Sequence, residues 1–175
     1  LVTVDPHLHR IARLDEAVPV TPALALCAAP LLGELAARER GRPLLVGPDE
    51  ESRAWVEAAA HASGLEYAVG RKERRGDRDV AVTLPEGLNV RGRAAVVLDD
   101  VASTGRTLAQ AVRALRSAGA ATVDVAVTHA LFVEDALETV RAAGAGAIWS
   151  TDTIAHPTNA VSVAPLMAQA ILAAL

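Results

Sequence analysis

The sequence predicts a three-layer α/β domain, in which a mainly parallel β-sheet carries helices on both faces. After residue 40, short runs rich in Val and Leu alternate with helical stretches, which is typical of parallel strands joined by crossover helices. Hydrophobic residues make up 51% of the 175, so a sizeable interior can be buried, and because aromatic residues make up only 2% that interior must be aliphatic. A chain of this length has room for one good core but not for two full-sized domains.

The elements of the first half follow from their apolar runs and from the residues that bound them. Residues 1–40 are expected to form the end of a strand, a loop and a helix over Leu24–Arg38. A strand over Pro43–Val46 then ends at Gly47-Pro48, and Asp49 can cap a helix over Glu50–Ala62 that Gly64 closes. The next strands are expected over Leu65–Val69 and Val80–Thr83, on either side of a charged stretch.

The second half contains the clearest buried strand, Arg93–Leu98, and a helix over Thr107–Ser117 that Gly119 terminates. Further elements are expected in this order: a strand over Thr122–Val127, a helix over Val133–Ala143, a strand over Ala147–Trp149 and a final helix capped by Ser162. We therefore expect residues 41–175 to form the domain and residues 1–40 to be the end of a preceding subdomain or a connecting helix. Because Leu1 opens directly on a β-like stretch, we also expect a domain upstream.

Charge and composition argue against several classes of partner. The net charge of −4 gives no reason to expect binding to nucleic acid or to an anionic membrane. No apolar run approaches the roughly 20 residues that span a bilayer. The single cysteine, Cys27, can form no internal disulfide and no zinc cluster, which suits a reducing compartment and predicts a cytoplasmic protein.

The segment Val96–Leu108, VVLDDVASTGRTL, carries the chemistry that the sequence predicts. Its strand delivers two adjacent carboxylates, Asp99 and Asp100, to the carboxyl end of the sheet, where open α/β sheets place their ligands. Such carboxylates can accept hydrogen bonds from vicinal hydroxyls, directly or through Mg²⁺.

The loop that follows these acids has the features of an anion site. The start of the next helix offers free backbone N–H groups and the positive end of the helix dipole. Ser103, Thr104 and Thr107 add hydroxyl groups, and Gly105 lets the backbone approach an anion closely. Hydrogen-bond donors for a phosphate lie beside two carboxylates that can accept from sugar hydroxyls. This combination predicts a sugar phosphate as the ligand.

A plain strand end followed by a capped helix is the alternative interpretation, and two adjacent acids before a Ser-Thr-Gly loop make it the weaker one. The segment contains neither the Gly-Lys-Ser/Thr of a nucleotide P-loop nor the spaced glycines of a dinucleotide fingerprint.

This segment resembles the phosphoribosyl pyrophosphate (PRPP) loop of type I phosphoribosyltransferases and of PRPP synthases, the ribose-phosphate diphosphokinases. Other stretches resemble synthases in particular: TVDPHLHR, VGPDEES and KERRGDRDVAV, and, in the C-terminal portion, THALFVEDALETV and STDTIAHPTNAVSVAPLMAQAI. The similarity thus covers nearly the whole chain, chiefly the C-terminal half of a synthase, and it implies the type I phosphoribosyltransferase fold.

The resemblance implies a role for each matching residue. Asp99 and Asp100 would hold the ribose hydroxyls with Mg²⁺, and Ser103, Thr104, Gly105, Arg106 and Thr107 would bind the 5-phosphate. Lys72 and Arg74, in a mobile catalytic loop, would stabilise the transferred pyrophosphoryl group. His7 would lie beside Mg²⁺ and the nucleotide, and Asp49 on the pyrophosphate side. The implied substrates are ATP and ribose 5-phosphate, and the implied assembly is a homo-oligomer.

Three features depart from the synthase pattern. Much of the first of the two synthase domains is absent, Glu50-Glu51-Ser52 stands where glycines are usual, and Arg106 stands where a small residue is common. Two other functions therefore stay open: a non-catalytic ribose-phosphate-binding partner or fragment of a synthase, and a phosphoribosyltransferase that consumes PRPP. The roles of His129 and Thr151–Thr153, which end or follow strands, also stay open between substrate contact and packing.

Overall fold

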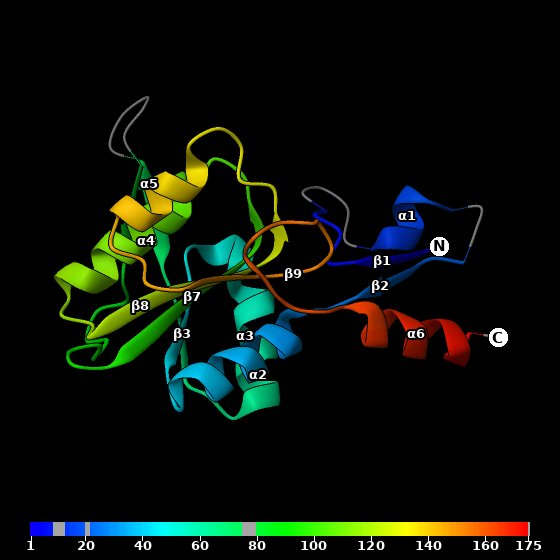
Figure 1. Ribbon diagram of the computed structural model, residues 1–175, viewed down its shortest axis with the longest axis horizontal. Helices are drawn as coiled ribbons and strands as arrows, with labels where there is room; N and C mark the ends of the chain where they lie inside the picture. Colours follow the sequence, from blue (N-terminus) through cyan, green and yellow to red (C-terminus); the bar gives the residue numbers. More distant parts are fainter. Residues whose placement is uncertain (9–12, 20–21, 75–79, 175) are drawn as a thin grey trace.

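A six-stranded, wholly parallel sheet lies at the centre of the molecule (Figure 1). The structure, a computed structural model, describes residues 1–8, 13–19, 22–74 and 80–174. The strand order is β10-β9-β8-β7-β3-β4. The bounds are β3 Leu44–Gly47, β4 Tyr67–Val69, β7 Ala94–Ala102, β8 Thr122–Ala130, β9 Ile148–Thr151 and β10 Asn159–Val161.

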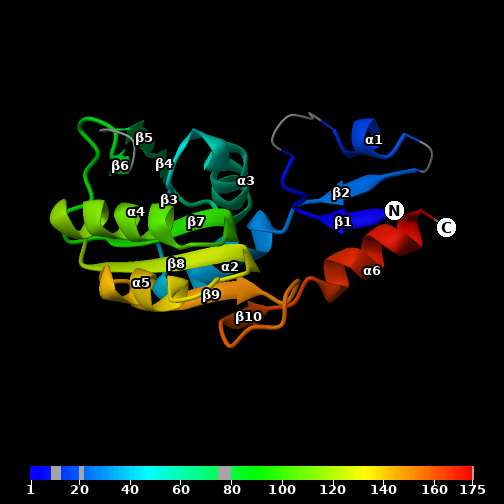
Figure 2. The same ribbon diagram turned by 90° about the horizontal axis from the view of Figure 1, so that it is seen from above.

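Helices cover both faces of this sheet (Figures 1 and 2). On one face, α2 (Ala29–Arg40) and α3 (Arg53–Ser63) bury an aliphatic core against the strands. On the other face, α4 (Arg106–Ser117) and α5 (Ala136–Ala142) bury a second, larger core. The predicted three-layer α/β fold with a mainly parallel sheet is confirmed.

The central strand β7 sends alternate side chains to the two cores. Val96 and Leu98 pack on the side of α2 and α3, whereas Ala95 and Val97 pack on the side of α4. The same alternation carries Asp99 toward α4 and Asp100 toward the opposite face.

A smaller group of elements lies beyond the carboxyl ends of β7, β8 and β9, as Figure 2 shows. It comprises a parallel pair of strands, β1 (Val2–Val4) and β2 (Leu24–Leu26), with the helices α1 (Leu14–Ala17) and α6 (Ala164–Ala173). A small apolar cluster around Val4, Ala28 and Val163 holds this group together, so residues from both ends of the chain contribute to it. The division of the chain at residue 40 stays a proposal.

An antiparallel hairpin of β5 (Arg71–Arg74) and β6 (Val80–Thr83) follows the edge strand β4. The expected charged loop is therefore wrong for Arg71–Arg74, because these residues pair with Val80–Thr83. Residues 75–79 of the same basic run lie outside the described residues.

Other boundaries differ from the sequence-based ones for local reasons. The expected helix over Leu24–Arg38 begins only at Ala29, since Leu24–Leu26 pairs with β1 and Pro30 occupies the first turn, where proline is tolerated. Strands β7 and β8 are longer than expected, so both aspartates lie within β7. The helix expected from Val133 begins at Ala136, because Phe132 and Glu134 adopt positive φ. Among the described residues, no helix is long and apolar enough to cross a membrane.

Candidate functional site

A small cavity of about 110 Å³ lies where β7 passes into α4. Asp99 and residues Val101–Leu108 line it. This brings Asp99 together with all five residues expected to bind phosphate: Ser103, Thr104, Gly105, Arg106 and Thr107. We call residues 102–106 the anion loop.

Gly105 is the residue on which the shape of this loop depends. Its φ of 69° is left-handed, a conformation that L side chains rarely adopt. A Cβ atom at this position would also lie 2.8 Å from the carbonyl oxygen of Ala136 and 2.9 Å from Cγ2 of Val140. The loop therefore lies directly against α5 because residue 105 has no side chain.

The start of α4 leaves backbone donors available in the anion loop. The first helical hydrogen bond runs from the amide of Ala109 to the carbonyl of Gly105, so the N–H groups of residues 106–108 precede it. No side chain in the described part of the chain caps this end. Ser103, Thr104 and Arg106 are exposed beside it. This arrangement suits an anion such as a phosphate.

Asp99 occupies an electrostatically unfavourable position in this cavity. Burial raises its pKa well above the usual value of 3.8, and the neighbouring carboxylates of Asp100 and Asp49 raise it further. An acid of this kind is stabilised in its charged form by a cation or by hydroxyl donors.

Asp100 is buried on the opposite face of β7 and contacts a residue distant in sequence. Nδ1 of His7 lies 2.6 Å from Oδ2 of Asp100. The predicted metal-side residues His7 and Asp100 are thus in direct contact, while Asp99 faces the anion loop. In the described ranges, no three or more His, Cys, Asp or Glu side chains converge as a metal cluster.

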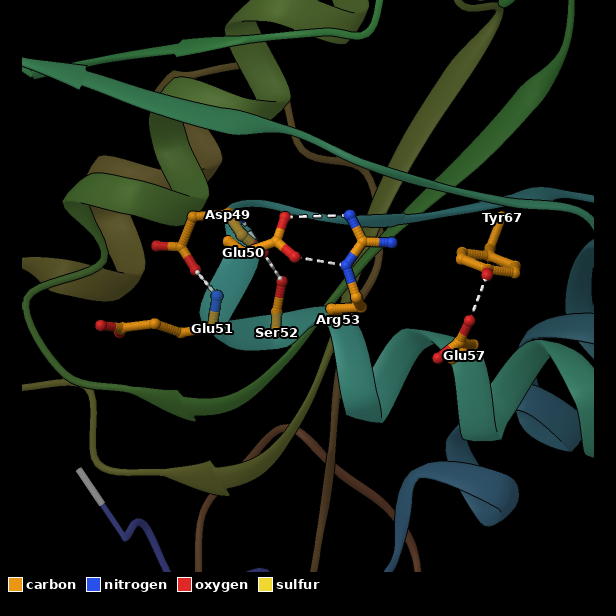
Figure 3. A network of polar contacts seen from close by, with 7 residues as sticks. All are labelled: Asp49, Glu50, Glu51, Ser52, Arg53, Glu57 and Tyr67. Carbon is orange, nitrogen blue, oxygen red and sulfur yellow. Dashed lines mark hydrogen bonds and ion pairs between the residues drawn. The ribbon is translucent and has the colours of Figure 1, made fainter. Parts of the chain in front are cut away.

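The segment after β3 forms a closed turn around Asp49, drawn in Figure 3. The Asp49 carboxylate accepts a hydrogen bond from the amide of Glu51 at 3.1 Å, and the Ser52 hydroxyl donates to the carbonyl of Asp49 at 2.6 Å. Asp49 thus caps the 3₁₀ turn η1 (Glu50–Ser52) directly before α3, as its predicted capping role requires. Glu50 forms a two-pronged ion pair with Arg53.

The predicted cations of the basic run are only partly placed. Nζ of Lys72 lies 3.9 Å from Oδ2 of Asp49, so Lys72 reaches the acidic side of the site. The backbone of Arg74 belongs to β5, but its side chain lies outside the described part of the structure. A larger hollow of about 930 Å³ lies beside β4, with Glu50, Arg53 and Arg71 among its lining residues and none of the β7 aspartates.

The hydrogen bonds that hold the Asp5–His7 segment escaped the sequence-based interpretation, although Asp5 lies in TVDPHLHR and the roles of His129 and Thr153 were left open. The buried carboxylate of Asp5 accepts hydrogen bonds from the Thr128 hydroxyl at 2.8 Å and from the amide of Ala28 at 3.1 Å. Nε2 of His129 lies 3.1 Å from the carbonyl oxygen of Asp5, and Nδ1 lies 2.9 Å from the hydroxyl of Thr153. One sequence signal for these contacts was that polar residues end the adjacent strands β8 and β9.

Comparison with known proteins agrees with this geometry. The phosphoribosyl transferase domain family matches the chain over residues 21–143. Two curated ribose-phosphate pyrophosphokinases are similar across 98% of the chain. The one from Methanopyrus kandleri is 39% identical and the second enzyme of Archaeoglobus fulgidus is 37% identical, and the match covers 58% and 60% of their lengths.

Solved structures of a synthetase and of a phosphoribosyltransferase are also similar to this chain. Phosphoribosylpyrophosphate synthetase from Mycobacterium smegmatis superposes with a TM-score of 0.76 at 28% identity, over 99% of this chain and 57% of that one. Adenine phosphoribosyltransferase from Thermoanaerobacter pseudethanolicus, at 18% identity, shares the fold with a TM-score of 0.57, over 70% of this chain and 76% of its own. The chain therefore spans a little under three fifths of the solved synthetase, and about that share of the two curated relatives.

Proposed function

The chain belongs to the phosphoribosyl transferase domain family, and we propose that it forms the ribose-phosphate-binding part of a ribose-phosphate diphosphokinase. That enzyme transfers a pyrophosphoryl group from ATP to the anomeric hydroxyl of ribose 5-phosphate and so makes PRPP. The observation that carries the proposal is the cavity at the end of β7, where an acid and an uncapped, hydroxyl-rich helix start face the same small space.

The anion loop suits the 5-phosphate of the sugar. Backbone N–H groups at the start of α4 and the hydroxyls of Ser103, Thr104 and Thr107 are the donors that a phosphate needs. Arg106 adds a permanent positive charge at the cavity, and its guanidinium can bind two phosphate oxygens at once. The carboxylate of Asp99 can accept hydrogen bonds from ribose hydroxyls, a function that the backbone N–H groups of the anion loop cannot serve.

Lys72 and Arg74 are proposed to face the pyrophosphoryl group. The position of Lys72 beside Asp49 supports this role, because its ammonium lies close to the acid that ends β3. Phosphoryl transfer depends largely on positioning and on stabilising charge, and two cations near the transferred group serve both needs.

The acidic side of the site fits Mg²⁺. Burial together with Asp100 and Asp49 raises the pKa of Asp99, and a divalent cation would relieve that repulsion. Mg²⁺ commonly takes only one or two carboxylates and completes its shell with water and substrate phosphates, so a closed protein cage is not needed. Asp99, Asp100 and His7 would be its protein ligands, with Asp99 on the side of the anion loop and Asp100 in contact with His7, while Asp49 would lie on the pyrophosphate side. When bound, the ion would neutralise charge on the phosphates.

An activity assay separates this proposal from its rivals. The chain is incubated with ATP, Mg²⁺ and ribose 5-phosphate and AMP is measured, while a second reaction contains PRPP and free nucleobases. Because the chain spans less than two thirds of its curated relatives, we expect ribose 5-phosphate to bind with slow or absent AMP release. Nucleotide formation in the second reaction would instead identify a phosphoribosyltransferase. Rapid AMP release would mean that these residues include a complete nucleotide site.

A further inference from the structure

The loop that joins β9 to β10, residues 152–158, is connected to both halves of the proposed site through His129 and Phe132. We call it the bridging loop. Near one end, Thr153 contacts His129, which in turn contacts Asp5 in the segment that carries His7. Near the other end, His156 contacts Phe132 in the segment that supports the anion loop. It lies on neither half itself, so its role must be indirect.

The first contact runs through Thr153. Nε2 of His129 must donate to the carbonyl of Asp5, since a carbonyl oxygen only accepts. The other ring nitrogen, Nδ1, lies 2.9 Å from the hydroxyl oxygen of Thr153, which itself donates to the carbonyl of Thr128 at 2.9 Å. Asp5 has a φ of 38°, a strained value for a residue other than glycine, and the contact from His129 helps to hold it there. His7 lies only two residues further, in contact with Asp100.

The second contact runs through His156. Its ring stacks on the ring of Phe132, with centroids 5.1 Å apart and an angle of 29° between the planes. Phe132 also has a strained φ, 35°, and its amide donates to the carbonyl of Ala102 at 2.8 Å. The next amide, that of Val133, donates to the carbonyl of Ser103 at 3.2 Å. The stacked ring therefore fixes a segment that supports the back of the anion loop.

Hydrogen bonds within and beside the bridging loop link its two ends. Nδ2 of Asn159 donates to the carbonyls of Thr151 and Ile154 at 2.6 and 3.0 Å, and its Oδ1 accepts from the amide of His156 at 2.9 Å. The carboxylate of Asp152 accepts from the amide of Val163, which ties the loop to the start of α6.

We propose that the bridging loop couples the anion loop to His7, with Thr153 and His156 as positioning residues. Binding of ribose 5-phosphate at the anion loop would shift the position of Phe132. Through the hydrogen-bonded bridging loop it would also shift the positions of Thr153, His129 and the Asp5–His7 segment. This inference rests on the proposed function, because it assumes that the anion loop binds ribose 5-phosphate. It adds a physical link between the sugar-phosphate half and the metal and nucleotide half of the site.

The test uses NMR spectra of the ¹⁵N-labelled chain and of the variants Thr153→Val and His156→Gln. Thr122→Val, at the exposed start of β8, and His61→Gln, on the exposed face of α3, are the matched controls. Without ligand, His156→Gln should shift the amide signals of residues 102–105, and Thr153→Val should shift those of Asp5 and His7. Neither control should do so.

Titration with ribose 5-phosphate then tests the coupling. In the wild-type chain the ligand should shift signals of both the anion loop and the His7 imidazole. In both bridging-loop variants its affinity should stay within about threefold, because no group that contacts the ligand is removed. The response at His7 should fall about twofold or more, since the link is broken. A His7 response of undiminished size in both variants would overturn the inference.

The two proposals fail in distinguishable ways. If ribose 5-phosphate shifts no signal of the anion loop, the proposed function is wrong, and the ligand-free spectra decide the inference alone. In that case, variant-induced shifts confined to residues 152–158 would overturn it, and shifts that reach residues 102–105, Asp5 and His7 would support it.

Discussion

Replacing Gly105 by alanine should destabilise the protein and distort the anion loop. Gly105 has a φ of 69°, and a left-handed conformation costs an L residue roughly 1–2 kcal/mol. The new methyl group would also meet the Ala136 carbonyl and Val140 at under 3.0 Å, and such overpacking costs roughly a further 1–3 kcal/mol. The total loss of unfolding free energy is about 2–5 kcal/mol, or roughly 4–20 °C in Tm for a chain of this size.

Gly64→Ala is the matched control, because Gly64 has a φ of 64° but no atom lies within 4 Å of the place that its new methyl group would take. Gly64→Ala should lose only the part of the unfolding free energy that comes from the left-handed backbone, about 1–2 kcal/mol. Urea unfolding of the two variants and the wild type gives the difference directly. If Gly105→Ala is no less stable than Gly64→Ala, the close contact between the anion loop and α5 does not exist as described.

Two further experiments, a substitution of Asp99 and a measurement of mass, test the electrostatics of the site and the assembly of the protein. Because the pKa of Asp99 is raised in the folded state, the folded protein binds protons more tightly than the unfolded chain, and stability is lost as pH rises through the folded pKa. Asp99→Asn should therefore raise the stability of the protein at pH 7 in metal-free buffer. It should give no gain below about pH 3.8, the usual pKa of an aspartate. Equal stability of the variant and the wild type at pH 7 would contradict the unfavourable environment of Asp99. We also expect self-association, since Ile171 and Leu172 of α6 are 44% and 72% exposed; light scattering that gives 18.1 kDa across a wide concentration range would contradict it.

Much of the fold could be predicted because its signals are local. The strand β7 is a continuous apolar run that ends in two acids, and Gly64 and Gly119 end their helices with positive φ. The position of the hydroxyl-rich turn between a buried strand and a helix was also predictable, and its proposed anion-binding role stays a prediction.

The missed features depend on contacts between distant residues. The resemblance implied that His7 and Asp100 lie beside the same metal, but no periodicity predicts their direct contact across 93 positions. The strand β2 is three residues long and is stabilised by β1, so its own sequence, LAL, is equally compatible with a helix. The positive φ of Phe132 contradicts the preference of an aromatic residue, and the tertiary contacts with His156 and Ala102 override that preference.

The central claim, that these residues form a ribose 5-phosphate site, is tested most directly by calorimetric titration of the chain with that sugar in the presence of Mg²⁺. The wild type should bind ribose 5-phosphate. The double variant Asp99→Asn/Asp100→Asn should lose about tenfold or more in affinity per carboxylate, since a hydrogen bond to a charged group contributes roughly 1.5–3 kcal/mol. Both proteins should still unfold cooperatively. Equal affinity in a double variant that melts cooperatively would contradict the account.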